Sequence, residues 1–531
     1  MSAHVDRFVL DNLPPREQWP QLLFDLPELH YPSVLNCAAA LLEHPAQAPP
    51  EAIAIRASEG DWSYGRLRAT VNQLCRVLTE DLGVVPGNRV LLRAVNSPMM
   101  IAAWLAVAKV GAVIVATMPM LRAKELHDIV EKGRVSIALC ESSLARELEE
   151  VRDSGGPLKR ILTWNGELES LLRAKAESFD AVATARDDPC LLAFTSGTTG
   201  QPKATVHFHR DILAMADTFS RHFLQPTASD VFTGTPPLAF TFGLGGELVF
   251  PFRVGASTAI LGGGRPEHIL EGIERFGVTR LFTAPTAYRA MLGVLQGRSL
   301  ASLRTCVSAG EHLPTATFDA WHTATGLRIV NGIGATEMTH IFIAAAGEAI
   351  RPGSTGKAVP GYRACVVDEE MKPVSPGTVG RLAVRGPTGC RYLADERQKR
   401  YVSDGWNLTG DAYVMDQEGY FWYQARTDDM IISAGYNIAG PEVEDALLKH
   451  PAVAECAVIG IPDEDRGQIV KAVVVLRPGH AGSPEMTSAL QKFVKGAIAP
   501  YKYPRALDYV RELPKTSTGK LQRFKLRHEG A

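Results

Sequence analysis

The sequence contains no uninterrupted hydrophobic run of membrane-spanning length and no excess of charge of one sign. The longest apolar stretch, residues 99–120, is broken by Lys109 and Gly111, so it predicts a buried helix followed by a buried strand. The first twenty residues carry acids and prolines without an apolar core, which argues against a signal peptide. A net charge of -2 provides no field that would recruit nucleic acid or anionic membrane. We therefore expect a cytoplasmic protein with no nucleic-acid or membrane partner.

Paired cysteines are also lacking. The eight cysteines are scattered, none forms a CxxC pair, and no His/Cys cluster has the spacing of a zinc site. This pattern predicts reduced thiols that mostly fill the core. The positions are Cys37, Cys75, Cys140, Cys190, Cys306, Cys365, Cys390 and Cys456.

The 531 residues are too many for one ordinary core and predict several domains. Apolar β-rich runs alternate with helical patterns through the first 350 residues, which favours an α/β fold with largely parallel sheets. The runs are 89–95, 112–117, 136–140, 191–197, 280–285 and 328–334. Short, turn-punctuated strands then indicate a small β subdomain. The last hundred residues have an α+β pattern, so we expect a large N-terminal domain, 1–427, and a smaller C-terminal domain, 428–531.

Residues 195–203 read TSGTTGQPK and follow an apolar strand. Backbone N–H groups, hydroxyls and a lysine in such a loop can bind phosphate. The stretch is not a Walker A motif, because the spacing of its glycines and lysine differs. The alternative is a polar turn between two elements.

The same stretch resembles the phosphate loop of the adenylate-forming enzymes, which include acyl- and aryl-CoA ligases, luciferases and peptide-synthetase adenylation domains. Four further motifs of that family follow in order: GIGATE (332–337), LTGD (408–411), ARTDDMIISAGYNIAGPEVE (425–444) and LPKTSTGK (513–520). The resemblance implies an enzyme that uses ATP and Mg²⁺ to join a carboxylate to AMP, releasing pyrophosphate. It then implies transfer of the acyl group to a thiol.

The resemblance also implies roles for particular residues. Glu337 would bind magnesium and Thr336 the α-phosphate, beside Gly334; Asp411 would bind the ribose hydroxyls, with Arg426 near the ribose and phosphate. The β and γ phosphates would be held by Thr195, Ser196, Gly197, Thr198, Thr199, Gly200 and Lys203. Taken alone, Glu337 could be a solvated acid, Asp411 a turn residue and Arg426 half of a surface ion pair. Many relatives have an aromatic residue beside adenine, where this chain has Ile333.

The resemblance makes Lys520 the catalytic lysine of adenylation, bridging the carboxylate and the α-phosphate. It places a hinge at Asp428, about which the C-terminal domain rotates between the two half-reactions. It also places Gly435 on the path of the incoming thiol. The chain ends eleven residues after Lys520, so free coenzyme A is the expected acceptor rather than a fused carrier domain. Dimers are common among such enzymes, which makes a homodimer one expectation.

The expected acyl pocket is short and mostly apolar, which suits a flat ring. Its residues would be Ala239, Phe240, Ala309, Gly310, Ile333, Gly334 and His340. GIGATEMTHIF (332–342) resembles benzoate-CoA ligases, and the N-terminal segments DNLPPREQWP and YPSVLNCAAALL resemble 2-aminobenzoate ligases. We therefore expect an aromatic carboxylic acid as substrate. A medium-chain fatty acyl-CoA ligase and a stand-alone enzyme that loads a carrier protein are the alternatives.

Overall fold

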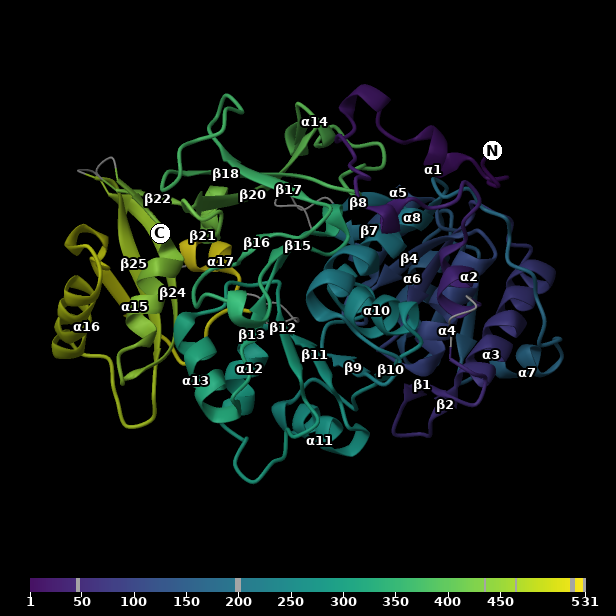
Figure 1. Ribbon diagram of the computed structural model, residues 1–531, viewed down its shortest axis with the longest axis horizontal. Coiled ribbons are helices and arrows are strands. Elements are labelled where there is room, and N and C mark those ends of the chain that lie inside the picture. Colours follow the sequence, from purple (N-terminus) through teal and green to yellow (C-terminus); the bar gives the residue numbers. More distant parts are fainter. Residues whose placement is uncertain (44–47, 196–201, 434–435, 464–465, 516–520, 529–531) are drawn as a thin grey trace.

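The structure is a computed structural model, and it describes residues 1–43, 48–195, 202–433, 436–463, 466–515 and 521–528 (Figure 1). A six-stranded sheet lies in the first part of the chain, and neighbouring strands in it are parallel except for β7 and β8. Its strands, in spatial order, are β6 (Arg160–Trp164), β5 (Ile137–Glu141), β3 (Arg89–Arg93), β4 (Val113–Thr117), β7 (Pro189–Thr195) and β8 (Lys203–Phe208).

A seven-stranded sheet follows, parallel except where β1 meets β2. Its strands, in spatial order, are β13 (Ile329–Asn331), β12 (Thr305–Ser308), β11 (Arg280–Thr283), β9 (Val231–Gly234), β10 (Ser257–Ala259), β1 (Ile53–Arg56) and β2 (Trp62–Ser63). The α/β expectation for the first 350 residues is confirmed.

Helices alternate with these strands (Figure 1). They are α1 (Phe8–Asp11), α2 (Cys37–Leu42), α3 (Tyr64–Arg76), α4 (Pro98–Lys109), α5 (Ala123–Gly133), α6 (Arg146–Asp153), α7 (Leu168–Arg173), α8 (His209–Met215), α9 (Thr241–Leu244), α10 (Phe250–Arg253), α11 (Pro266–Phe276), α12 (Pro285–Leu292) and α13 (Thr315–Thr325). Three π-helical segments in the described ranges extend this set: η3 (Val77–Asp81) after α3, η5 (Ala216–Leu224) after α8 and η6 (Gly245–Val249) after α9.

The apolar stretch 99–120 forms α4 and β4, as predicted. Ser97 caps α4 by accepting a hydrogen bond from the N–H of Met100 at 3.2 Å, and Pro98 occupies the first turn. The helix is buried almost all round, because it packs against β3, β4, α2 and α3. Every helix in the described ranges is too short or too polar to cross a membrane.

The expected small β subdomain is present, and its strands are antiparallel. One sheet contains β17 (Arg363–Val367), β18 (Val379–Arg385), β20 (Trp406–Met415), β19 (Val402–Ser403) and β21 (Phe421–Arg426), with α14 (Gln398–Tyr401) beside it. A second contains β14 (Ile333–Gly334), β15 (Ile341–Ala344) and β16 (Lys357–Ala358). The run 328–334 is therefore divided between two sheets, at Gly332, where a Cβ would lie 2.6 Å from the side chain of Ile341.

The last hundred residues form a separate layer at one end of the molecule (Figure 1). Its elements are β22 (Ile431–Ser433), β23 (Tyr436–Ile438), α15 (Gly440–Leu448), β24 (Val453–Asp463), β25 (Gly467–Leu476), α16 (Pro484–Ala497), β26 (Ala506–Tyr509) and α17 (Arg523–His528). Among the described residues, two ionic contacts link this layer to the rest of the chain: His312 Nε2 lies 3.4 Å from Asp445, and Arg289 lies 4.0 Å from Glu455. The boundary expected after residue 427 falls between β21 and β22 and stays a prediction.

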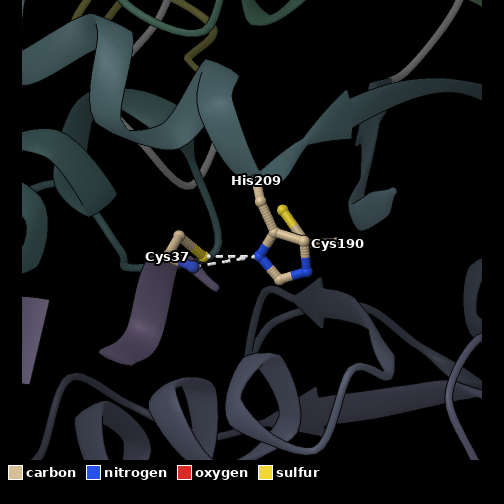
Figure 2. Close-up of side chains that lie close together, drawn as sticks. All are labelled: Cys37, Cys190 and His209. Atoms are coloured by element: carbon tan, nitrogen blue, oxygen red, sulfur yellow. Dashed lines mark hydrogen bonds between the residues drawn. The ribbon is translucent and has the colours of Figure 1, made fainter. Parts of the chain in front are cut away.

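The fold gathers Cys37, Cys190 and His209 from three elements, although their sequence spacing gives no sign of it (Figure 2). All three are fully buried. His209 Nδ1 accepts the backbone N–H of Cys37 at 3.1 Å and lies 3.2 Å from its Sγ. Because α2 begins at Cys37, the imidazole satisfies one of the amide groups that a helix start leaves without a partner. This contact ties the N-terminal segment to α8.

Candidate active site

The two ends of the expected phosphate loop lie opposite each other. Thr195 ends β7, Lys203 begins β8, and the two residues are paired across the antiparallel strands. The strand pairing thereby fixes where the loop leaves and re-enters the sheet. The other predicted members of the loop, Ser196, Gly197, Thr198, Thr199 and Gly200, lie outside the described residues.

Lys203 and Glu337, predicted from separate motifs, meet in the structure. Lys203 Nζ lies 3.3 Å from Glu337 Oε1 and donates to the hydroxyl oxygen of Tyr392 at 2.9 Å. The Tyr392 hydroxyl in turn donates to Glu337 Oε1. Glu337 is buried, with only 8% of its side chain exposed. The three side chains therefore form a closed polar triangle beside the start of β8.

Tyr392 was missed by sequence reasoning, because nothing in its neighbourhood (GCRYLAD) resembles a family motif. The segment around it runs alongside β8: Val206 N donates to Arg391 O at 2.8 Å, and Leu393 N donates to Ala204 O at 2.9 Å. This pairing brings the phenol to Lys203. Burial first, and then the neighbouring Glu337 carboxylate, raises the pKa of Tyr392, so the hydroxyl remains a donor at neutral pH.

The donor set suits a hard divalent cation. Both hydrogen bonds to Glu337 from the described residues end on Oε1. Within the described ranges, Oε2 makes no hydrogen bond and remains available as a ligand. A buried carboxylate oxygen is a ligand that Mg²⁺ prefers. Glu337 therefore fits the metal role that the resemblance implied, and that role stays a proposal.

Thr336 and Glu337 lie on a single 3₁₀ turn, η7 (Thr336–Met338), directly after β14. Gly334 lies in β14 and approaches the backbone of the returning chain closely. A Cβ at Gly334 would lie 2.7 Å from the carbonyl oxygen of His340, so a side chain is excluded there. Ile333 is half-buried and pairs with Ile343 of β15. It offers an aliphatic surface at the position where many relatives have an aromatic ring.

Asp411 and Arg426 face each other across β20 and β21. Arg426 Nη1 donates to Asp411 Oδ1 and to the carbonyl oxygen of Thr409, both at 3.0 Å. Burial alone would lower the pKa of Arg426, but the charge and hydrogen bond of the Asp411 carboxylate leave that pKa above its ordinary value. Asp411 is thus a strand residue rather than the turn residue of the alternative interpretation, and its side chain is 11% exposed.

The predicted acyl-pocket residues come from three segments that approach one another. Ala239 and Phe240 precede α9, and both are half-buried. Ala309 and Gly310 follow β12, whose last residue, Ser308, accepts the N–H of Gly332 at 2.9 Å. The third segment comprises Ile333, Gly334 and His340, joined by the β14–β15 turn. A hydrogen bond thus joins the second segment to the third, and Phe242, two residues after Phe240, has its ring centroid 5.6 Å from that of His340; a shared acyl pocket stays a prediction.

His340 lies in an aromatic cluster. Its ring centroid is 4.7 Å from that of Phe250 and 5.6 Å from those of Phe219 and Phe242. Burial lowers the pKa of His340 to about 3, so the imidazole is neutral at physiological pH. The imidazole can therefore line a pocket for an aromatic ring without carrying charge.

Three further predicted positions lie wholly or partly outside the described structure. Lys520 and Gly435 are not among the described residues, and of Asp428 only the backbone is described, in the turn that follows β21. The residues that flank Lys520 are anchored within the C-terminal layer. Lys515 Nζ lies 2.6 Å from Glu455, and Arg523 lies 2.7 Å from Glu444.

With this geometry in view, comparisons with known proteins assign the family. Residues 42–392 match the model of AMP-binding enzymes, and residues 442–520 match that of the AMP-binding enzyme C-terminal domain. Benzoate–CoA ligase of Thauera aromatica is 35% identical over 479 residues, which cover 88% of this chain and 91% of that protein. The mitochondrial acyl-coenzyme A synthetase ACSM3 of Mus musculus is 32% identical over 485 residues, covering 88% and 84%.

Among solved structures, the anthranilate CoA ligase AuaEII in complex with anthranoyl-AMP superposes with a TM-score of 0.90 at 35% identity. The match covers 95% of this chain and 99% of that one. The chain belongs to the AMP-binding enzyme family. It is an AMP-forming acid–thiol ligase, and the α/β architecture expected from the sequence is that of these enzymes.

Proposed function

We propose that this ligase is an ATP-dependent aryl-acid–CoA ligase whose substrate is benzoate or 2-aminobenzoate. The proposal rests chiefly on the convergence of Lys203, Tyr392 and Glu337 at the start of β8. That polar triangle lies at one end of the expected phosphate loop. Similarity to a benzoate–CoA ligase and to an anthranilate CoA ligase supports the aryl acid.

In the first half-reaction, a carboxylate oxygen attacks the α-phosphorus of ATP. The bond from that phosphorus to the bridging oxygen breaks, and pyrophosphate leaves. Both reactants are anions, so the protein acts mainly by positioning them and neutralising charge. Lys203 and the loop that it closes would hold the leaving group, and Lys520 would bridge the carboxylate and the α-phosphate.

Glu337 would hold Mg²⁺, which supplies positive charge to the polyphosphate when bound. Asp411 would accept hydrogen bonds from the two ribose hydroxyls, since one carboxylate has an oxygen for each. Arg426, held against Asp411 at 3.0 Å, would fix the orientation of that carboxylate.

In the second half-reaction, the thiol sulfur of coenzyme A attacks the acyl carbon, the mixed anhydride C–O bond breaks, and AMP leaves. The C-terminal domain, 428–531, would rotate at Asp428 between the two steps, bringing Gly435 to the thiol's path in place of Lys520. The contact of His312 with Asp445 belongs to only one of those two arrangements, because it joins the two domains.

A substrate panel tests the proposal. Purified enzyme is incubated with ATP, Mg²⁺, coenzyme A and one acid at a time, and the thioester is measured by mass spectrometry. We expect kcat/KM for benzoate or 2-aminobenzoate to exceed that for octanoate by at least about tenfold, because a short slot rejects a long chain. Preference for octanoate would instead support a medium-chain ligase. Adenylate formation without thioester would support the loading of a carrier protein.

A further inference from the structure

The predicted acyl-pocket residues Ala239 and Phe240 lie in a loop that follows β9 of the seven-stranded sheet. This loop is held by the side chain of Asn96, which follows β3 of the six-stranded sheet. Asn96 lies between β3 and α4. Its Nδ2 donates to the carbonyl oxygen of Pro236 at 3.1 Å, and its Oδ1 accepts the N–H of Leu238 at 2.8 Å. The amide thereby pairs with two backbone groups of the loop, as a neighbouring strand would.

Glu247 fixes which way that amide points. Asn96 Nδ2 also lies 3.1 and 3.2 Å from the two carboxyl oxygens of Glu247. The nitrogen has two hydrogens, so it can serve both Pro236 and Glu247, whereas Oδ1 is left for Leu238. The carboxyl group is 1% exposed, and burial raises its pKa well above the usual range. Burial thus favours the uncharged form of Glu247, whereas Asn96 is half-buried.

The segment that carries Glu247 also contacts the predicted pocket. Glu247 lies on the π-helical turn η6, which begins with Gly245. A Cβ at Gly245 would lie 2.4 Å from Cδ2 of His340, so the turn's backbone packs directly on the imidazole. Phe242, on α9, lies against the same ring at 5.6 Å between centroids. Asn96 and Glu247 therefore connect the loop to the helical turn that packs against His340.

We propose that Asn96 and Glu247 are positioning residues that hold the acid-binding loop, residues 235–240, in a fixed position relative to His340. The inference rests on the proposed function, because it assigns that loop to the acid rather than to ATP. The two hydrogen bonds from Asn96 to the loop end on Pro236 and Leu238, whereas the proposed polyphosphate site comprises Lys203, Tyr392 and Glu337. Loss of these two hydrogen bonds should therefore weaken acid binding and leave ATP binding intact.

The test is acid-dependent pyrophosphate exchange by the full chain, with KM measured separately for benzoate and ATP. For Asn96→Ala we expect a KM for the acid about tenfold higher, the effect of losing a hydrogen-bond pair, and a KM for ATP within about twofold. Glu247→Ala should raise the acid KM about threefold, because Asn96 then loses its orienting acceptor. Glu247→Gln should restore it, since an amide oxygen still accepts from Nδ2.

Asn36→Ala is the matched control. Asn36 also donates to backbone carbonyls, those of Ala108, Lys109 and Val182, and it caps α2; it is buried, whereas Asn96 is half-buried. It should lower the melting temperature without changing either KM. The inference is overturned if Asn96→Ala and Glu247→Ala shift both KM values by equal factors, or if Asn36→Ala raises the acid KM as much as they do. Failure of the wild-type enzyme with every acid would instead overturn the proposed function, and this inference with it.

Discussion

Tyr392→Phe tests the polar triangle that the sequence did not predict. The substitution removes one hydroxyl and keeps the ring, including its contact with Lys203, whose Nζ lies 5.0 Å from the ring centroid. Two hydrogen bonds disappear: the one donated to Glu337 and the one received from Lys203 at 2.9 Å. The direct contact between Lys203 and Glu337, at 3.3 Å, remains and limits the loss.

The magnitude follows from those contacts. A hydrogen bond to a charged group contributes about 1.5–3 kcal/mol. With the lysine–carboxylate contact retained, we expect a net loss of about 2 kcal/mol in transition-state stabilisation, or about 30-fold in kcat/KM for adenylation. Thioester formation from supplied acyl-AMP should change less than about threefold, because no pyrophosphate is held in that step.

The assay compares pyrophosphate exchange with thioester formation from synthetic acyl-AMP. Tyr401→Phe is the control, because the Tyr401 ring packs edge-on against that of Tyr392 at 5.8 Å. Its buried hydroxyl makes no hydrogen bond in the part of the chain that the structure describes. The control should keep both activities. The reasoning is refuted if Tyr392→Phe retains adenylation within about threefold of wild type, or if Tyr401→Phe loses as much.

Three further predictions concern the predicted lysine, the ribose site and the buried histidines. Lys520→Ala should abolish adenylation but spare thioester formation from supplied acyl-AMP; equal loss in both half-reactions would count against that division of labour. Asp411→Ala should raise KM for ATP by about tenfold or more, since it removes the proposed acceptor for the two ribose hydroxyls and frees Arg426; an unchanged KM for ATP would remove Asp411 from the site. Burial lowers the pKa of His4 and His207 to about 4 and that of His340 to about 3. These groups stay neutral in the folded state and bind protons in the unfolded state below about pH 6.5, so the free energy of unfolding should be highest above that pH and fall as the pH drops towards 4. Urea unfolding between pH 7.5 and 4.5 measures this slope, and His340→Phe should reduce it by about one proton; a denaturation midpoint independent of pH would contradict the assignment.

The sequence was a good guide to individual elements and a poor guide to contacts between distant ones. Residues 99–120 gave α4 and β4, because burial and periodicity are local properties. Tyr392 could not be found in this way. It reaches Lys203 only through pairing of its segment with β8, almost 190 positions away in the chain.

The same limit applies to the run 328–334, which is divided between two sheets, and to the contact between Asn96 and Glu247. The run 328–334 reads as one strand, yet β13 joins the seven-stranded sheet and β14 joins another. Hydropathy reports that such residues are buried but not which sheet receives them. Asn96 and Glu247 are ordinary polar residues in the sequence, and only the approach of two sheets makes them partners. The predicted positions Lys203, Glu337, Asp411 and Arg426 could be named because family motifs carry them.

The shielding of the cysteines has a consequence for a protein that makes a reactive acyl donor. All eight are free thiols, six of them buried and two half-buried. Burial raises the pKa of Cys75, Cys140, Cys190, Cys306, Cys365, Cys390 and Cys456. Cys37 is the exception: burial raises its pKa, but Cys190 and His209 outweigh burial and lower the pKa to about 5, and its sulfur is kept from solvent by being fully buried. Only an accessible thiolate competes well for an activated carbonyl. In the proposed reaction the chain is thus protected from acylating its own sulfur, and the activated acid survives until a thiol from solution arrives.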